Sequence, residues 1–183
     1  MKNRKNILIV ILFVSGILLY VIIRTPQYSF SNNKQETRNK PISTGHEGEL
    51  LPEIDLLLTD SLTYVNTATA PDGKPIVLFY FAPYCPYCKT ELNEIIKNMK
   101  YLKNIQFYLI TPYFISDIKK FYEDNQLEKY GNVIIGRDYK FKFGDFFKTQ
   151  NVPYLVIYTS NKKMNAAFIG NVKYDQIKSI SEK

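Results

Sequence analysis

The chain opens with an unbroken apolar run, which a polar stretch follows. Residues 7–23 are uncharged and almost wholly apolar, and at about 1.5 Å per residue a helix over them nearly spans a hydrocarbon core of about 30 Å. Residues 24–49 are rich in Ser, Asn and charged side chains and show neither helical nor alternating periodicity. The pattern predicts a short tail over 1–6, a transmembrane anchor over 7–23 and a flexible linker over 24–49.

From residue 50 onward, short β-prone runs alternate with stretches of helical spacing. The run over 76–81 is apolar throughout, as in a strand buried on both faces, whereas the apolar residues of 90–103 recur every three or four positions, as on one face of a helix. Further strands are predicted at 54–58, 63–65, 105–111, 132–136, 154–158 and 164–170, and further helices at 116–127, 143–150 and 174–180. Strands that alternate with helices indicate an α/β fold, and the tight turn between the last two strands adds an antiparallel edge. We expect one domain over 50–183 with a mixed central sheet flanked by helices.

A cleaved secretory signal is the alternative for the N-terminal segment, because Lys2, Arg4 and Lys5 precede the apolar run. The residues after the run contain no small-x-small cleavage pattern, which favours an uncleaved anchor. Basic residues lie on both sides of the run, so their count alone does not orient it. Large downstream domains are translocated largely regardless of charge. We therefore expect a single-pass protein of the cell membrane, with a cytoplasmic N-terminus and an extracytoplasmic domain in the periplasm or on the outer face.

The formal net charge of +7 does not predict a nucleic-acid partner. Seven basic and three acidic residues precede Leu50, so +4 belongs to the N-terminal part and +3 to the predicted domain. The basic excess therefore lies near the predicted anchor, where anionic lipid attracts it. We expect membrane lipid as the partner of residues 7–23 and no nucleic acid.

The only two cysteines, Cys85 and Cys88, lie between the predicted strand over 76–81 and the helix that follows. A closed zinc site wants four ligands, but the predicted domain has no histidine, because His46 lies in the predicted linker, where we expect it to be solvated. A structural disulfide here would close a loop of only a few residues and contribute little stability. Zinc, copper delivery and a structural cross-link remain open alternatives to a reactive dithiol.

A reactive pair explains where the cysteines lie. Cys85 falls at a helix start, where unpaired N–H groups and the helix dipole stabilise a thiolate, and Pro86 suits the first helical position. Cys88, one turn further on, is placed to attack a mixed disulfide formed at Cys85. We therefore expect Cys85 to be the exposed nucleophile and Cys88 the more buried resolving cysteine. Beyond their redox-active disulfide we expect no cofactor and no metal.

The segment IVLFYFAPYCPYCKTEL, residues 76–92, resembles the active-site strand and helix of thioredoxin-like proteins, and more narrowly of TlpA/ResA-type membrane-anchored disulfide reductases. Val152-Pro153, in NVPYLVIY, matches the family's cis-proline, and the last hairpin matches in SNKK and in FIGNV, with its glycine at Gly170. Residues 113–136 match the family's additional helix and strand. The resemblance runs from about residue 50 to the C-terminus.

This resemblance implies a thioredoxin-like fold and a role for several residues. Pro153 would face the cysteine pair, and the backbone of Val152 would pair with the substrate chain; an ordinary turn proline is the alternative. Tyr84 and Tyr87 flank the thiols and are candidate substrate contacts, although aromatic packing also explains them.

One position departs from the family's pattern. Thioredoxins commonly carry a buried Asp six positions before the first cysteine, where this chain has Phe79. Glu91, which matches the common Cys-x-x-Cys-x-x-Glu form, is the candidate proton acceptor. An exposed helix-surface glutamate is the alternative, because burying an unpaired carboxylate is costly.

The sequence thus predicts a membrane-anchored, extracytoplasmic thiol-disulfide oxidoreductase with a Cys-Pro-Tyr-Cys dithiol. The resemblance alone favours reduction, with disulfide-containing exported proteins as clients and a membrane electron donor or acceptor of dithiol type as a further partner. A peroxiredoxin-like peroxidase and a non-catalytic binding module are the alternatives. Peroxidase chemistry in that family wants Thr or Ser three positions before the reactive cysteine, where this chain has Ala82.

Overall fold

The computed structural model describes Tyr20 and residues 39–183. The predicted tail over 1–6, the anchor over 7–23 apart from Tyr20, and the linker up to residue 38 lie outside these residues. Within the described ranges, no helix is both long enough and apolar enough to cross a membrane.

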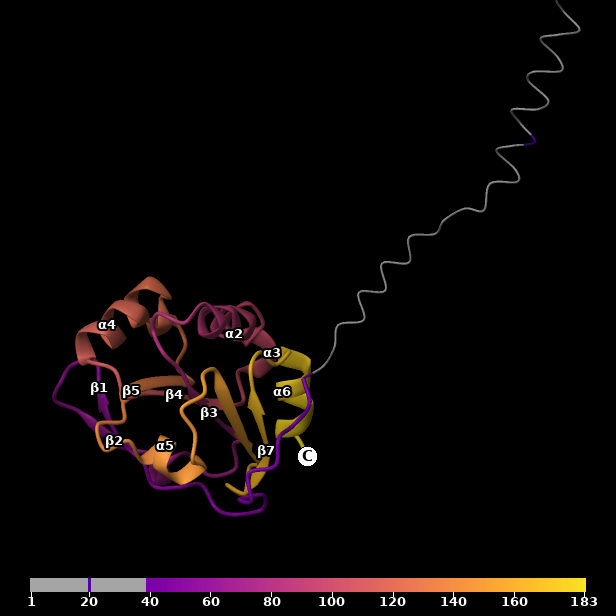
Figure 1. Cartoon of the computed structure of the whole chain (residues 1–183), viewed down its shortest axis with the longest axis horizontal. Coiled ribbons are helices and arrows are strands. Elements are labelled where there is room, and N and C mark those ends of the chain that lie inside the picture. The colour runs from indigo at the N-terminus through magenta and orange to yellow at the C-terminus, as the bar shows by residue number, and fades with distance from the viewer. Residues whose placement is uncertain (1–19, 21–38) are drawn as a thin grey trace, which may run out of the picture. The chain divides into compact units, whose positions relative to one another are not determined.

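A seven-stranded mixed sheet forms the centre of the domain (Figure 1). Its strands are β1 (Asp55–Leu58), β2 (Tyr64–Asn66), β3 (Ile76–Tyr80), β4 (Gln106–Thr111), β5 (Val133–Arg137), β6 (Tyr154–Tyr158) and β7 (Met164–Ile169). They are arranged in the order β2-β1-β5-β4-β3-β6-β7. β3, β4 and β5 are parallel, while β6 and β7 and the β1–β2 hairpin are antiparallel to their neighbours. The predicted α/β fold with a mixed sheet is confirmed.

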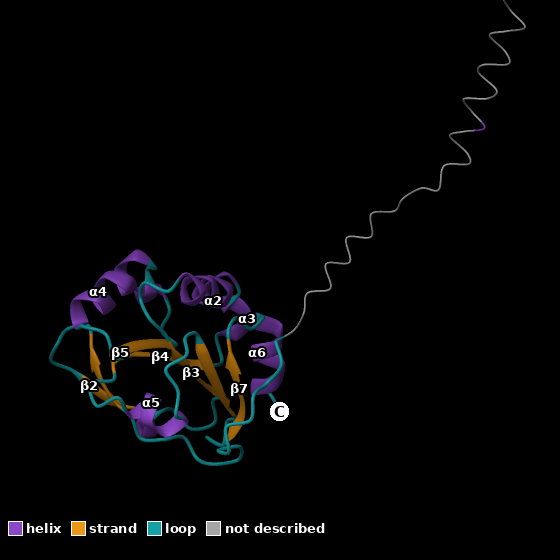
Figure 2. Cartoon of the chain, viewed as in Figure 1, coloured by secondary structure: helices purple, strands orange, loops and turns teal. Residues whose placement is uncertain are grey.

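Helices cover both faces of this sheet (Figure 2). They are α2 (Pro86–Lys97), α3 (Met99–Leu102), α4 (Ile115–Asp124), α5 (Lys142–Phe147) and α6 (Tyr174–Ser181), with short 3₁₀ turns η1 (Thr67–Thr69) and η2 (Leu127–Lys129). Figure 2 shows α2, α3, α4 and α6 on one side of the sheet and α5 on the other. The single helix predicted over 90–103 is two helices, because the Asn98 side chain donates to the Glu94 carbonyl at 2.9 Å and ends α2.

Alternate side chains of β3 pack into two hydrophobic cores, one on each face of the sheet. Val77 and Phe79 belong to the core beneath α2, α4 and α6, whereas Ile76, Leu78 and Tyr80 belong to the core beneath α5. All of β3 is buried. Successive side chains of a strand point to opposite faces, which explains why a central strand covered on both sides is apolar throughout.

Residues 42–50 pair with the edge strand β7 instead of forming a linker. The Ile42 N–H donates to the Ala167 carbonyl at 2.8 Å, and Leu50 forms an antiparallel bridge with Lys163. The prediction of a flexible linker extending to residue 49 is therefore wrong for its last part. Main-chain pairing of this kind covers a sheet edge that would otherwise offer unpaired N–H and carbonyl groups.

His46, in the same segment, is held against α5. Its ring stacks on Phe146 with 4.2 Å between ring centroids. The Nδ1 atom lies 2.8 Å from Glu49 Oε2, and Nε2 lies 3.1 Å from the Phe146 carbonyl oxygen. The expectation that His46 is merely solvated is wrong, because these contacts fasten its segment to the domain.

Candidate active site

Cys85 lies at the N-cap position of α2, just beyond the end of the buried strand β3. Its backbone is extended (φ −74°, ψ 121°), and Pro86 follows as the first helical residue, where no N–H partner is required. Cys85 is partly exposed, whereas Cys88 is fully buried, and both are free thiols. The structure therefore presents one sulfur at the surface and keeps the other inside, as the spacing of the two cysteines predicts.

Burial disfavours ionisation of the Cys88 thiol. Burial raises the pKa of Cys88 to about 12, and the neighbouring Cys85 and Glu91 add to the rise, while a main-chain hydrogen bond from Ala82 opposes it. The contribution of Cys85 changes once its sulfur is bonded to another sulfur, since a disulfide carries no charge. A proton acceptor must nevertheless be available for Cys88 to attack near neutral pH.

Glu91 lies one turn after Cys88 and is fully buried. The alternative of an exposed helix-surface glutamate is therefore wrong. Its Oε2 accepts hydrogen bonds from the Val172 N–H at 2.8 Å and from Asn171 Nδ2 at 3.2 Å. Its Oε1 has no hydrogen-bond partner among the described residues. Burial raises the pKa of Glu91 to about 7, although the two hydrogen bonds act against the rise. A carboxyl group that titrates near neutral pH suits proton transfer.

Asn171 and Val172, between β7 and α6, are site residues that the sequence analysis missed. Asn171 Nδ2 also donates to the Tyr87 carbonyl at 2.9 Å, so this side chain contacts both the cysteine turn and Glu91. Eighty positions separate Asn171 from Glu91, so no local spacing pattern links them. The available signal is indirect: a buried carboxylate requires hydrogen-bond donors, but the sequence does not identify the segment that supplies them.

The Val152–Pro153 peptide bond is cis, as the resemblance implies. The Pro153 carbonyl accepts a hydrogen bond from the Gly170 N–H at 2.9 Å, and Val152 packs against the same core as Cys85. The main-chain N–H and carbonyl of Val152 have no hydrogen-bond partner among the described residues. They can therefore pair with an extended chain.

Phe79 fills the place where thioredoxins commonly carry a buried acid. It is fully buried, and its ring centroid lies 5.7 Å from that of Phe81 in the core beneath α2. Since β3 supplies no carboxylate here, Glu91 is the acidic side chain whose charge acts on Cys88.

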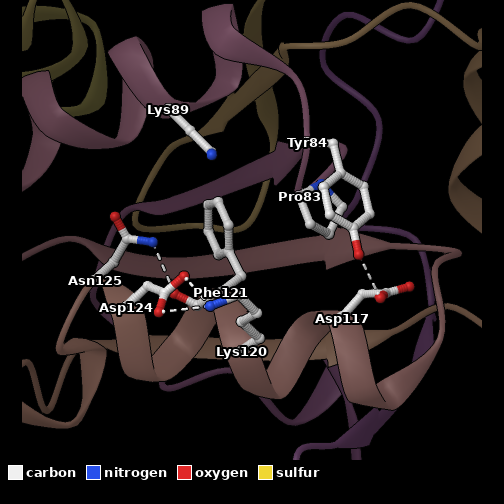
Figure 3. Close-up of a pocket in the computed structure, with 8 residues that line it drawn as sticks. All are labelled: Pro83, Tyr84, Lys89, Asp117, Lys120, Phe121, Asp124 and Asn125. Carbon is white, nitrogen blue, oxygen red and sulfur yellow. Dashed lines mark hydrogen bonds and ion pairs between the residues drawn. The ribbon is translucent and has the colours of Figure 1, made fainter.

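Tyr84 and Tyr87 are 65% and 66% exposed. The Tyr84 hydroxyl donates to Asp117 Oδ1 at 2.6 Å, and this bond raises the pKa of Tyr84. Figure 3 shows Tyr84 and Asp117 at one end of a pocket of about 160 Å³ between α2 and α4, with Lys89 pointing into it. Both tyrosine rings lie on the surface next to the cysteine turn, where a substrate could contact them.

The chemistry open to this arrangement is thiol–disulfide exchange. An accessible sulfur at a helix start, a buried sulfur one turn away and a buried carboxyl group can act as a nucleophile, a resolving thiol and a proton acceptor, respectively. Across the described ranges, no group of three or more His, Cys, Asp or Glu side chains could hold a metal ion.

Comparison with protein families matches residues 48–169 to the AhpC/TSA family. This match covers more than half of the chain. A search of curated proteins found no significant match.

Solved structures with a similar fold include StoA and two disulfide oxidoreductases. StoA from Bacillus subtilis is 16% identical with a TM-score of 0.56, over 73% of this chain and 99% of that one. A secreted Mycobacterium tuberculosis disulfide oxidoreductase is 16% identical with a TM-score of 0.57, over 69% of this chain and 92% of that one. The thioredoxin domain of a Bacteroides vulgatus thiol-disulfide oxidoreductase is 17% identical with a TM-score of 0.56, over 73% of this chain and 93% of that one. At these identities the similarity shows the thioredoxin-like fold, in agreement with the TlpA/ResA-type resemblance found in the sequence.

Proposed function

The chain belongs to the AhpC/TSA family, and from its cysteine geometry we propose that it is a thiol-disulfide oxidoreductase that reduces disulfides of exported proteins. One observation carries the proposal: a partly exposed Cys85 at the start of α2 is followed, one turn later, by a fully buried Cys88. This pairing of an accessible and an inaccessible thiol serves a two-step exchange, in which the first sulfur attacks and the second releases the product.

In the first step, the Cys85 thiolate attacks one sulfur of a client disulfide. A Cys85–client bond forms, and the other client sulfur leaves as a thiolate. In the second step, Cys88 gives its proton to Glu91 and attacks the Cys85 sulfur, so the Cys85–Cys88 disulfide forms and the second client sulfur leaves as a thiolate. The client gains two electrons and the dithiol loses two. A membrane dithiol donor then returns the protein to its reduced form.

Glu91 is the proposed proton acceptor in the second step. Its Oε2 is held by Val172 and Asn171, while Oε1 has no partner among the described residues and is free to receive a proton directly or through one water. A pKa of about 7 keeps a large share of Glu91 deprotonated at neutral pH. This role supplies the acid that the position of Phe79 does not.

Client contact is proposed at the backbone of Val152 and at the two exposed tyrosines. The N–H and carbonyl of Val152, which have no partner in the part of the chain that the structure describes, can add a client segment in the manner of a β-strand. Tyr84 and Tyr87 lie on either side of Cys85 in the chain and are exposed, so they can cover the apolar part of the bound segment.

The catalytic step is tested by single-turnover reduction of a peptide disulfide by the pre-reduced chain. We expect two peptide thiols per protein, and we expect that Cys85→Ala abolishes the reaction. Cys88→Ala should release one peptide thiol and retain the other peptide as a mixed disulfide. If Cys85→Ala reduces the peptide as fast as the unsubstituted chain, the proposal fails and the binding-module alternative gains support.

A peroxiredoxin-like peroxidase is the rival within this family. The residue three positions before Cys85 is Ala82, which has no hydroxyl group to orient a peroxide, so we expect negligible consumption of hydrogen peroxide. Peroxide turnover at enzyme-like rates that depends on Cys85 would replace the proposed function.

The reducing direction is supported by family resemblance alone, and a redox titration tests it. Equilibration of the Cys85–Cys88 pair with glutathione or dithiothreitol buffers should give a potential in the range of reductants, near that of thioredoxin, about −270 mV. A value near that of strong oxidants, about −120 mV, would assign oxidation instead.

Membrane anchoring through residues 7–23 and an extracytoplasmic domain are part of the proposal. The test uses Cys88→Ala, in which Cys85 is the single cysteine of the chain. After a reductant has released mixed disulfides from Cys85, a membrane-impermeant maleimide should label this cysteine in intact cells as fully as in lysed cells. Labelling that occurs only after lysis would put the domain on the cytoplasmic side.

A further inference from the structure

Exposed aromatic side chains gather on the three loops that follow the parallel strands β3, β4 and β5 and on the first turn of α2. These side chains, named here the aromatic collar, are Tyr84, Tyr87, Tyr113, Phe114, Tyr139 and Phe141. They make up half of the large apolar and aromatic side chains that are exposed in the described ranges. The carboxyl ends of parallel strands lie at the same end of a sheet. Cys85 is at the start of α2, at this same end of the sheet. The collar therefore borders the reactive cysteine.

Contacts between the loops orient Tyr84, Tyr113 and Phe114, whereas the Tyr139 ring packs edge to face against Tyr64 of β2, with 5.7 Å between centroids. The rings of Tyr84 and Tyr113 meet edge to face, with 6.3 Å between centroids. The Arg137 guanidinium at the end of β5 lies 5.2 Å from the centre of the Phe114 ring, on the loop after β4, and Arg137 Nε donates to the Pro112 carbonyl at 3.3 Å. These contacts orient the rings, yet Phe114 is still 68% exposed. Exposed aromatic side chains beside a reactive cysteine are candidate contacts for a partner.

Two helices that begin at this end of the sheet have an aromatic residue at the N-cap position. Phe114 is the N-cap of α4 and Phe141 the N-cap of α5, and neither makes the side-chain cap that Ser, Thr, Asp or Asn would provide. Asp138 instead accepts the N–H groups of Lys142 and Phe143 at the start of α5. Phe141 has a left-handed backbone (φ 55°), which is uncommon for a bulky residue, and remains 56% exposed. Conformations of this kind gather at functional sites.

A hollow of about 280 Å³ adjoins the collar and is lined by two of its members, Tyr113 and Phe141. Ala82 and Val152 also line it. Ala82 leads into the cysteine turn, and the backbone of Val152 has the unpaired groups proposed to bind a client. The hollow is thus continuous with the proposed client contact.

We propose that the aromatic collar binds an extended client segment and that the hollow receives a large apolar or aromatic side chain next to the client's cysteine. This inference rests on the proposed function and adds the class of client: a chain that is unfolded around its disulfide and carries aromatic or large apolar residues beside it. An extended segment fits because only such a segment can pair with Val152 and place a neighbouring side chain in the hollow. Tyrosine and other aromatic residues give contact area at a low entropic cost, as in other recognition surfaces.

The test uses two peptide disulfides in single turnover with the pre-reduced full chain. Each consists of two short peptides joined by one disulfide, with a fluorophore on one peptide and a quencher on the other, so reduction raises fluorescence. One version has Phe on each side of its cysteine and the other has Ser there. We expect the Phe version to react at least about tenfold faster with the unsubstituted chain.

Collar variants are read as the ratio of the two rates. The double substitution Tyr113→Ser/Phe114→Ser, and separately Phe141→Ser, should reduce this ratio about tenfold. Tyr101→Ser is the matched control, because Tyr101 is 48% exposed on α3, which precedes β4 and so lies toward the opposite end of the sheet. It should keep the ratio of the unsubstituted chain. Circular dichroism establishes that each variant is folded, and Phe141→Ser keeps the test decisive if the double variant is not.

Three outcomes would overturn the inference. Equal rates for both peptides in the unsubstituted chain would reject the collar and leave the proposed oxidoreductase intact. No reduction of either peptide would reject the proposed function, and the collar's role with it. A collar variant that changes the oligomeric state in gel filtration and keeps the rate ratio would identify the collar as an interface between copies of the chain.

Discussion

Replacing Glu91 with glutamine removes a buried ionisable group and retains its size. Glutamine can also still accept the Val172 N–H that Glu91 Oε2 accepts at 2.8 Å. Because Glu91 is fully buried, its charge must be taken out of water on folding, and the free energy of unfolding should depend on its protonation.

The size of this effect follows from the pKa of Glu91. The pKa is about 7 in the folded chain against an ordinary value of 4.5, and at 1.36 kcal/mol per pKa unit the difference amounts to about 3 kcal/mol. The folded-state pKa is raised, so this stability is fully present below about pH 4.5 and is lost as the pH rises through about 7. Between pH 4 and pH 8 the wild-type chain should therefore lose about 3 kcal/mol that Glu91→Gln does not lose.

Urea unfolding of the reduced protein at several pH values between 4 and 8 measures this difference. The quantity to compare is the change in the free energy of unfolding with pH, because any constant cost of the glutamine amide then cancels. Glu123→Gln, at an exposed position on α4, is the matched control and should follow the wild-type curve. Parallel curves for wild type and Glu91→Gln across this range would refute the reasoning, since the Glu91 charge would then cost nothing on folding.

Two further substitutions test the packing and the support of the site. In Gly136→Ala, the added Cβ would lie 2.8 Å from Leu56 Cβ and 3.1 Å from the Leu57 carbonyl oxygen. We therefore expect the free energy of unfolding, measured with urea, to fall by about 1–3 kcal/mol. In the control Gly131→Ala, the added Cβ meets nothing within 4 Å, and the free energy of unfolding should not fall. Asn171→Ala removes a hydrogen bond that lowers the pKa of Glu91. The pH midpoint of peptide reduction should then rise by about 0.5–1 unit, whereas Asn165→Ala, which removes a bond to the Ile180 carbonyl instead, should not move it.

Local sequence patterns predicted much of the fold. The continuous apolar run over 76–81 identified the central strand because β3 is covered on both faces, and Pro86 after Cys85 identified a helix start. These features are readable because each depends on the chemistry of one short segment. The family resemblance, rather than a local pattern, assigned Val152-Pro153 and Gly170, and the structure adds that the Gly170 N–H donates to the Pro153 carbonyl.

Features that depend on distant segments were not readable in this way. Glu91 looks like a surface residue of an amphipathic helix, and only the Asn171–Val172 loop, about 80 positions later, shows that it is buried with donors. The segment 42–50 is polar and aperiodic, yet it is ordered by main-chain pairing with β7, which no side-chain pattern records. Likewise, the collar residues come from separate segments of the chain, and the parallel order of β3, β4 and β5 places these segments at the same end of the sheet.

The most direct test of the central claim is capture of clients in cells by Cys88→Ala, compared with Cys85→Ala and the unsubstituted chain on non-reducing gels. The account predicts that Cys88→Ala accumulates mixed disulfides through Cys85, that reductant releases them, and that Cys85→Ala accumulates none. If Cys88→Ala traps no more protein than Cys85→Ala, Cys88 does not resolve a client intermediate, and the dithiol is not the catalytic centre described here.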